Sequence, residues 1–417
     1  MTAKGELKIG CEVCRAKQPS HVRKGKPEAL PCAYFSVWRR HLCLASFPHV
    51  FSSFPMHYKR KIQHALIPMV LLPMLIGMEA CCTWEDRFTQ EFDCNPEFAA
   101  VDTTINLSSI AFGSCADQDD DQPLLNDASA SDADLFIFLG DNVYIDSRDC
   151  SDFFSEYSKL ACKPEFAELV MHTPTMAVWD DHDYGENDSG MEYPMREVSK
   201  DVFLRFWNEP LQSARRKHNG IYHSQMFGDS AHRVQVILLD MRSFRSPLTE
   251  QNDEYLADND PTRSFLGAAQ WEWLEEQFLL DARVRIIASS TQFGIEHNGW
   301  EEWANFPLEQ QRMADVIART QANGVLFLSG DVHYSELSRH EFPGCYPIYD
   351  CTASGITQVE DGAAPNQYRD GEAVVAQNFG HLAIDWMANP VQLTYTIRTA
   401  GGTIAYSHVF ELDEISF

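Results

Sequence analysis

The stretch Leu135-Phe136-Ile137-Phe138-Leu139-Gly140-Asp141-Asn142-Val143-Tyr144 decides the fold class of this 417-residue chain. Its first five residues form a short apolar run, which is typical of a strand buried on both faces. Gly140 permits a tight turn, and Asp141 then follows the strand. A carboxylate there is costly to bury unless it is paired or coordinates a cation, and the alternative is an Asp that only forms the turn. Tyr144, three residues on, offers a hard phenolate oxygen that suits a ferric ion.

Similar short apolar runs recur along the chain. From about residue 105 they alternate with the helical patterns Ala268–Leu280 and Leu308–Ala322, which predicts an α/β layered fold. The end of the chain, from Leu382 through Phe410, predicts strands joined by turns. No Pro/Gly/Ser-rich linker divides residues 105–417, so we expect one domain there. The predicted buried strands are Ser109–Phe112, Leu135–Leu139, Thr175–Trp179, Val234–Leu239, Val284–Ala288 and Val325–Leu328.

Three further strand ends carry residue types that bind metals. Cys115 offers a thiolate, although a small buried residue is the alternative interpretation. Asp181 offers a metal ligand and His182 a hydrogen bond to a substrate or leaving group. Asp331 and His333 alternate, so both can reach one metal region. Ligand sites in open α/β folds lie outside the carboxyl ends of strands, where these motifs are expected. The motifs are Ala111-Phe112-Gly113-Ser114-Cys115, Trp179-Asp180-Asp181-His182-Asp183 and Leu328-Ser329-Gly330-Asp331-Val332-His333.

Weaker candidates lie near the same strand ends. Arg242 can steady a phosphate by a bidentate contact, or it can form a structural ion pair. Asn187 and Asp188 offer additional oxygen ligands, and Gln292 is a candidate for lining the site.

Together these residues describe a site for two cations. Two metal ions about 3.5–4 Å apart activate a water and clamp an in-line displacement at phosphorus. That chemistry needs oxygen and nitrogen ligands from several strand ends, which this chain supplies. The sequence contains no serine nucleophile elbow and no phosphate-cradling Walker loop that would indicate a different mechanism.

The order of these motifs resembles that of the PhoD-like alkaline phosphatases, which belong to the calcineurin-like metallophosphatase superfamily. The resemblance runs from about residue 105 to the C-terminus, and the segment Ser354-Gly355-Ile356-Thr357-Gln358 also fits it. It implies an α/β sandwich of two mixed β-sheets flanked by helices. It also implies a hydrolase acting on ester bonds, which cleaves phosphate monoesters, diesters or both by attack of a metal-activated water.

The resemblance also implies roles for individual residues. Asp141 is expected to bridge two metals, with Cys115, Tyr144 and His333 near a ferric ion. Asp181 and Asp331 then serve the second metal, while His182 faces the substrate. Iron (Fe3+) and calcium are the metals that the resemblance implies, with other divalent ions as alternatives.

The N-terminal part of the sequence predicts export. Residues 56–80 combine a basic start, an apolar run of 14 residues and the small Ala80, which indicates a signal peptide too short to span a bilayer. We expect a periplasmic, cell-surface or secreted protein, with lipid attachment at Cys81 as an alternative. Residues 1–55 are interpreted as a non-structural extension and 81–104 as a linker. The competing interpretation of the extension is a zinc module built on Cys11, Cys14, Cys32 and Cys43.

Charge and cysteine content limit the partners. Residues 1–80 carry a net charge of +8 and residues 81–417 carry −36, so we expect no nucleic-acid-binding surface. The expected partner is a small phosphoester or phospholipid substrate, and the protein is expected to be a monomer without a stable membrane span. Export permits disulfides, for which Cys150–Cys162 and Cys345–Cys351 are the sequence-local candidates. The alternative function is a non-catalytic, exported metal-binding protein that retains the fold.

Overall fold

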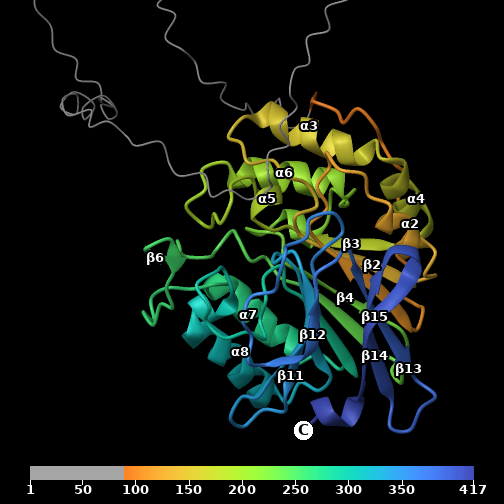
Figure 1. Ribbon diagram of the computed structural model, residues 1–417, viewed down its shortest axis with the longest axis vertical. Helices are drawn as coiled ribbons and strands as arrows, with labels where there is room; N and C mark the ends of the chain where they lie inside the picture. Colours follow the sequence, from red (N-terminus) through yellow and green to blue (C-terminus); the bar gives the residue numbers. More distant parts are fainter. Residues whose placement is uncertain (1–88) are drawn as a thin grey trace, which may run out of the picture. The chain divides into compact units, whose positions relative to one another are not determined.

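Two mixed β-sheets pack against each other in this computed structural model, which describes residues 89–417 (Figure 1). The predicted extension at 1–55, the signal peptide at 56–80 and the candidate lipid site Cys81 lie outside the described residues. Residues 89–104, in the expected linker, form no strand, and Phe92 among them packs into the core on the helical side.

The first sheet has six strands in the order β15-β14-β13-β1-β2-β3. The strands β1, β2 and β3 are parallel, whereas β13, β14 and β15 are antiparallel to their neighbours. The parallel half therefore turns three carboxyl ends toward one edge of the sheet. The strands are β1 (Ser109–Gly113), β2 (Leu135–Leu139), β3 (Thr175–Val178), β13 (Phe379–Asp385), β14 (Gln392–Thr399) and β15 (Thr403–Glu411).

The second sheet has seven strands in the order β12-β10-β11-β9-β8-β5-β4, with β5, β8, β9 and β11 parallel. A separate two-stranded hairpin consists of β6 (Glu250–Gln251) and β7 (Glu254–Tyr255). The strands of the large sheet are β4 (His223–Phe227), β5 (Val234–Leu238), β8 (Val284–Ala288), β9 (Val325–Ser329), β10 (Ser335–His340), β11 (Ile348–Ala353) and β12 (Arg369–Val374).

The side chains of β2 show why its sequence is apolar throughout. Leu135, Ile137 and Leu139 belong to the core between the two sheets, while Phe136 and Phe138 belong to a second core on the helical side. Successive side chains of a strand point to opposite faces, so a strand covered on both sides needs apolar residues at every position. The predicted two-face burial of this strand is confirmed.

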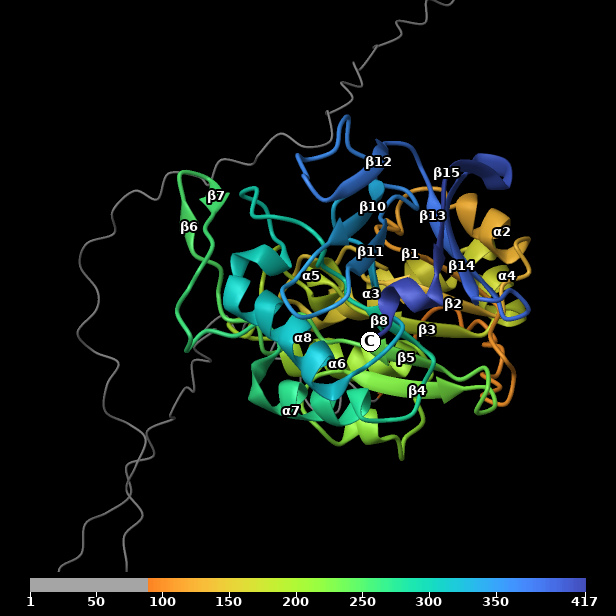
Figure 2. The same cartoon turned by 90° about the horizontal axis from the view of Figure 1, so that it is seen from below.

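Helices cover the outer faces of both sheets. The helices α2 (Leu124–Ser129), α3 (Cys150–Ala161), α4 (Pro164–His172) and α6 (Arg196–Phe206) pack on the parallel half of the first sheet. The second sheet is covered by α7 (Gly267–Phe278) and α8 (Pro307–Thr320), which lie beside each other in Figure 2. Within residues 89–417, no helix combines the length and the apolar character that crossing a bilayer requires. The short helices are α5 (Asp181–Tyr184), η1 (Ala214–Arg216), η2 (Trp303–Asn305), η3 (Ala400–Gly402) and η4 (Leu412–Ile415).

The predicted fold class and elements are confirmed. All six predicted buried strands form, each within one residue of its predicted bounds, and the two predicted helices correspond to α7 and α8. The C-terminal strands form β13, β14 and β15, and Gly401 in the predicted turn adopts a positive φ of 70°. A Gly has no Cβ to clash there, which explains why the turn contains this residue type.

The predicted disulfide pairs are wrong. Cys162 is bonded to Cys94, Cys150 is disulfide-bonded elsewhere, and Cys345 and Cys351 are free. Cys150 begins α3 and Cys162 follows its last residue, so a helix about 18 Å long separates them. A disulfide needs Cα atoms within about 7 Å. Closeness in sequence was therefore a poor guide, because the helix holds the two thiols apart.

Candidate metal centre

Strand ends from both sheets meet at one place. Ser114, after β1, forms a parallel bridge with Ser354, after β11, and the N–H of Gly330, after β9, donates to the carbonyl of Ser290 at 2.7 Å. This seam brings together five residues from the ends of β1, β2, β3 and β9, namely Cys115, Asp141, Asp181, Asp331 and His333.

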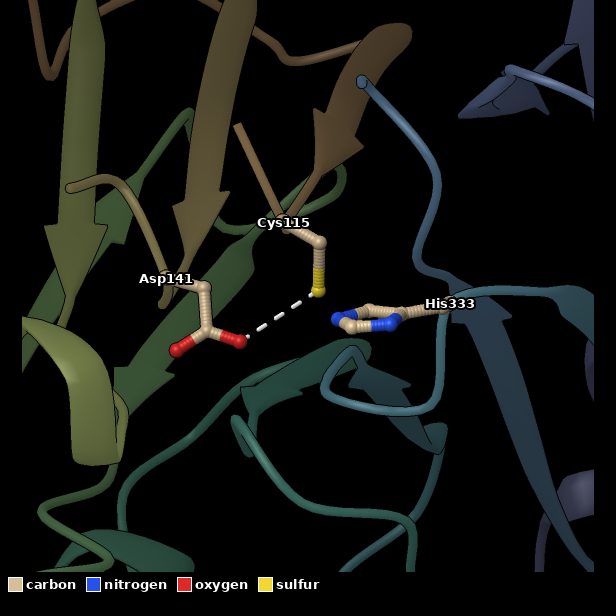
Figure 3. Close-up of side chains that lie close together, drawn as sticks. All are labelled: Cys115, Asp141 and His333. Atoms are coloured by element: carbon tan, nitrogen blue, oxygen red, sulfur yellow. Dashed lines mark hydrogen bonds between the residues drawn. The ribbon is translucent and has the colours of Figure 1, made fainter. Parts of the chain in front are cut away.

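The first ligand cluster consists of Cys115, Asp141 and His333, which converge from three separate strand ends (Figure 3). Potential ligand atoms of these residues lie within 4.8 Å of one another, and Cys115 Sγ is 3.4 Å from Asp141 Oδ2. Tyr144 joins them, because its hydroxyl lies 3.4 Å from His333 Nε2. The cluster therefore offers sulfur, nitrogen and oxygen donors.

The second cluster contains only carboxylates. Asp141, Asp180, Asp181 and Asp331 each present an oxygen within 4.8 Å of the others. Asp141 belongs to both clusters, and a third grouping joins it to Asp181 and His182. One carboxylate thus lies between a mixed donor set and an oxygen-only donor set, which is the arrangement that a bridging ligand requires.

Four of these residues adopt an unusual backbone conformation. The φ angles are 60° for Cys115, 48° for Asp141, 73° for Asp331 and 59° for His333. A residue with a Cβ is strained in this left-handed region, which costs on the order of 1 kcal/mol or more and concentrates at functional sites. Each residue lies in a loop that follows a strand, and its side chain belongs to one of the clusters at the seam.

Gly140 allows the approach of two of the carboxylates. Its φ is 100°, and a Cβ there would lie 2.5 Å from Asp180 Cβ and 2.8 Å from Asp180 N. Only a residue without a side chain lets the turn after β2 lie this close to the turn after β3. The close packing brings Asp141 and Asp180 into the same cluster.

The electrostatics of the carboxylates favour a bound cation. Burial, followed by the charges of Cys115 and the neighbouring aspartates, holds the pKa of Asp141 well above its usual value. Burial and the charges of Asp180 and Asp181 likewise raise the pKa of Asp331 well above its usual value. Negative groups that destabilise one another in this way are stabilised by positive charge.

Three buried carboxylate oxygens without hydrogen-bond donors indicate that these residues fit metal ions. Among residues 89–417, Asp141 Oδ1, Asp180 Oδ2 and Asp181 Oδ1 are buried and accept no hydrogen bond. An unpaired buried carboxylate oxygen is costly, because it has lost water without gaining a donor. Cations at these oxygens remove that cost.

The thiol of Cys115 is tuned toward its anionic form. Burial alone raises its pKa, but the charge of His333 and its hydrogen bond, together with Ser114 and Ser354, lower the pKa to about 6. For His333, burial lowers the pKa, yet the Cys115 charge and hydrogen bond give a net increase. A thiolate is the form that binds a metal.

His182 is oriented by Asp146. Its Nδ1 lies 2.9 Å from Asp146 Oδ2, and its ring packs on Tyr144 with 4.3 Å between centroids. Burial lowers the pKa of His182, but the charges of Asp181 and Asp146 raise it to about 10. Nε2 lies 4.0 Å from Asp181 Oδ2, so the second ring nitrogen faces the cluster.

Arg242 lies in an ionic network. The side chain is fully buried, its Nε donates to Asp180 Oδ1 at 2.6 Å, and its Nη1 donates to Glu301 at 2.8 Å. Arg245 Nε lies 3.0 Å from the same glutamate. Of the two roles considered for Arg242, the structure shows the ion pair.

The weaker candidates differ in position. Asp188 lies beside Asp181 and Glu301 within 4.8 Å, whereas Asn187 is exposed and donates to Asp188 Oδ2 at 2.6 Å. Gln292 is buried, and its amide donates to Glu336 and Thr352 at 3.0 Å. Gln292 thus hydrogen-bonds to strands of the second sheet and belongs to neither ligand cluster.

The sequence did not identify three residues of this site. Asp180 follows Trp179 at a strand end, a signal equal to that of Asp181. Asp146 and Glu301 lie in loops where no periodic pattern marks them, and only the tertiary structure brings them to His182 and Arg242. Asp183 is not among the clustered acids, because its carboxylate accepts from the backbone N–H groups of Asn142 and Asp180 and fixes the turn after β2.

The fold and the two clusters define a class: an α/β sandwich with candidate metal-binding groups at its strand ends. The chain belongs to the PhoD-like phosphatase family, whose sequence profile matches residues 110–360. This metallophosphatase family implies divalent metal ions and a phosphatase-type hydrolase.

Individual proteins and solved structures resemble parts of this chain. Alkaline phosphatase D of Bacillus subtilis (strain 168) is 24% identical over 187 residues, covering 39% of this chain and 31% of that protein. The solved structure of PhoD superposes with a TM-score of 0.62 at 17% identity and covers 76% of this chain and 72% of its own. A dimetal phosphatase from Danio rerio is a looser likeness, with a TM-score of 0.46, 12% identity and coverage of 74% and 100%.

Gly140→Ala is expected to abolish stable metal binding, because the new Cβ pushes Asp180 away from Asp141. Metal content per chain after gel filtration, measured by elemental analysis, tests this. Gly362→Ala is the matched control, since no atom lies within 4 Å of the Cβ it adds, and it should retain wild-type metal content. A folded Gly140→Ala protein with full metal content would show that the close approach is unimportant.

Proposed function

We propose that this protein hydrolyses phosphate monoesters, diesters or both at the seam around Asp141. The observation that carries the proposal is the position of Asp141 in both ligand clusters. Two-metal phosphoester hydrolysis needs a ligand shared between adjacent ions. Membership of the PhoD-like phosphatase family supports the same chemistry.

We assign iron to the first cluster and calcium to the second. The thiolate, phenol and imidazole groups of Cys115, Tyr144 and His333 suit a transition metal, because such ions accept sulfur and nitrogen ligands. Asp180, Asp181 and Asp331 offer only oxygen, which a hard cation such as calcium prefers. Asp141 serves both ions, and Asp188 is a further oxygen ligand at the edge of the second cluster.

The bound ions would stabilise negative charge on the phosphoryl group and lower the pKa of an attacking water. The protein must also position a group that donates a proton to the leaving oxygen. Asp146 accepts a hydrogen bond from His182 Nδ1 and fixes the ring orientation, and the raised pKa of the imidazole keeps a second proton on Nε2. Arg242 holds Asp180 and Glu301 in place and acts on the site through them.

We also propose that the protein is exported and acts as a monomer. The Cys94–Cys162 disulfide supports export, because disulfides persist in oxidising compartments. The predicted signal at 56–80 is consistent with it.

Asp141→Ala is expected to lower kcat by at least about 1000-fold, because loss of the shared ligand removes several kcal/mol of transition-state stabilisation. The assay measures hydrolysis of para-nitrophenyl phosphate and of its bis ester with iron and calcium present. Asp413→Ala, which removes an exposed carboxylate near the C-terminus, should keep full activity. If the metal-loaded wild type hydrolyses neither ester, the non-catalytic metal-binding alternative holds, and the ratio of the two rates defines the ester preference.

Cys115→Ser is expected to lose iron while the protein stays folded, because a serine hydroxyl does not ionise as readily as a thiol. Iron per chain by elemental analysis and far-UV circular dichroism give the two readouts. Cys351→Ser, at another buried free cysteine, is the matched control and should retain iron. Unchanged iron in Cys115→Ser would mean that Cys115 is only a core residue.

Asp146→Asn is expected to slow hydrolysis most for esters with a poor leaving group. A general acid contributes about 10²- to 10⁴-fold, and it matters little when the leaving group is as stable as para-nitrophenolate. We expect kcat to fall roughly 10- to 100-fold for phenyl phosphate but only slightly for para-nitrophenyl phosphate. Asp149→Asn, which changes the exposed N-cap of α3, should alter neither rate. Equal losses on both esters would exclude this role for the Asp146–His182 pair.

A further inference from the structure

The segment Ser354–Glu360 connects the two halves of the first ligand cluster. The carbonyl of Cys115 accepts the N–H groups of Thr357 and Gln358, and the N–H of Glu360 donates to the carbonyl of His333 at 3.0 Å. One continuous segment after β11 therefore contacts the Cys115 turn of the first sheet and the His333 turn of the second.

Ser354, the first residue of this segment, contacts both ligand residues with one atom. Its Oγ lies 3.1 Å from Cys115 Sγ and accepts the backbone N–H of His333 at 2.8 Å. The residue is fully buried, so water cannot replace either contact. His333 makes this contact from a left-handed conformation, with a φ of 59°.

The direction of the Ser354–Cys115 hydrogen bond follows from its neighbours. A hydroxyl has one proton, and the N–H of His333 already uses a lone pair of Ser354 Oγ as acceptor. A cysteine that binds a metal is a thiolate, which can only accept. Ser354 must then donate its proton to Cys115 Sγ.

We propose that Ser354 is a positioning residue that donates a hydrogen bond to the Cys115 thiolate and tunes the sulfur as a metal ligand. The inference rests on the proposed metal site. A donor on a thiolate withdraws electron density from the sulfur, and such outer-shell hydrogen bonds orient ligands and adjust the metal. The same hydroxyl fixes the backbone of His333, so it couples two ligands that come from different sheets.

Ser114 provides a natural comparison within the same cluster. Its hydroxyl is also close to Cys115 Sγ, at 3.4 Å, but it has the carbonyl of Ala353 as an acceptor at 3.3 Å. Its single proton is shared between the sulfur and that carbonyl, so Ser114 is a weaker donor to the sulfur than Ser354, whose hydroxyl lies at 3.1 Å. Removal of the Ser114 hydroxyl should therefore change the thiolate less than removal of the Ser354 hydroxyl.

The test uses cobalt(II) as a spectroscopic probe of the full-length protein. A cobalt–thiolate bond gives a ligand-to-metal charge-transfer band, and Cys115→Ser should remove it. We expect Ser354→Ala to move the band to longer wavelength, because a thiolate without its donor gives up an electron more easily. Competition with a chelator should show cobalt affinity lower by about 10- to 100-fold. Ser114→Ala should shift the band less than Ser354→Ala does, and circular dichroism checks that each variant is folded.

Two outcomes would overturn the inference. A wild-type band position in folded Ser354→Ala, even with weaker cobalt binding, would reduce Ser354 to a support for the His333 backbone. A wild-type spectrum without a thiolate band would remove Cys115 as a ligand, and Ser354 with it. Hydrolysis of para-nitrophenyl phosphate by iron- and calcium-loaded wild type is measured in parallel, so loss of the inference is distinguishable from loss of the proposed function.

Discussion

The repulsion between buried negative groups around Asp141 is the constraint on which the rest of the site depends. Cys115, Asp180, Asp181 and Asp331 all lie close to this carboxylate, and several of their oxygens have no donor among the described residues. Such a cluster is destabilising by itself, since each charge is both desolvated and repelled. The chain keeps these groups together by backbone contacts, which is reasonable only if positive charge occupies the space between them.

The protein supplies part of that positive charge itself, and the two sides of Asp141 receive it from different groups. Arg242 is fully buried against Asp180 and Glu301, with Nη2 3.6 Å from Asp181 Oδ1. On the other side of Asp141, His333 is the basic group beside the thiolate, and its raised pKa reflects that contact. The oxygen-rich side is thus pre-ordered by a permanent guanidinium, whereas the sulfur side depends on an imidazole that must be neutral to bind a metal. This asymmetry gives the two positions different chemistry even though they share one carboxylate.

The sequence predicted the strands and the residues directly after them. A buried strand is recognised from a short apolar run, and a candidate ligand from a charged residue that follows it, so a few neighbouring residues suffice for both. The register that brings Asp180 beside Asp141 depends on Gly140, whose role is visible only when β2 and β3 are paired. The Asp146–His182 contact and the Arg242–Glu301 contact join residues that are 36 and 59 positions apart, and no pattern in the sequence specifies them. The disulfide predictions were wrong for the same reason, since they used distance along the chain in place of distance in space.

The backbone is strained at four ligand residues, and the packing of the two sheets keeps it so. The residues in left-handed conformations are Cys115, Asp141, Asp331 and His333. Each residue follows a strand of a buried sheet. An unfavourable conformation at a single residue is tolerated when hydrogen bonds to the surrounding backbone fix it. For Cys115 those bonds come from the segment after β11, and for Asp141 its carbonyl accepts the N–H of Ala116 at 2.8 Å. The ligands are therefore held by contacts between strands of different sheets and by contacts within one sheet. A change that loosens the packing of the two sheets would relax these turns, so the geometry of the site and the stability of the sandwich are set by the same interactions.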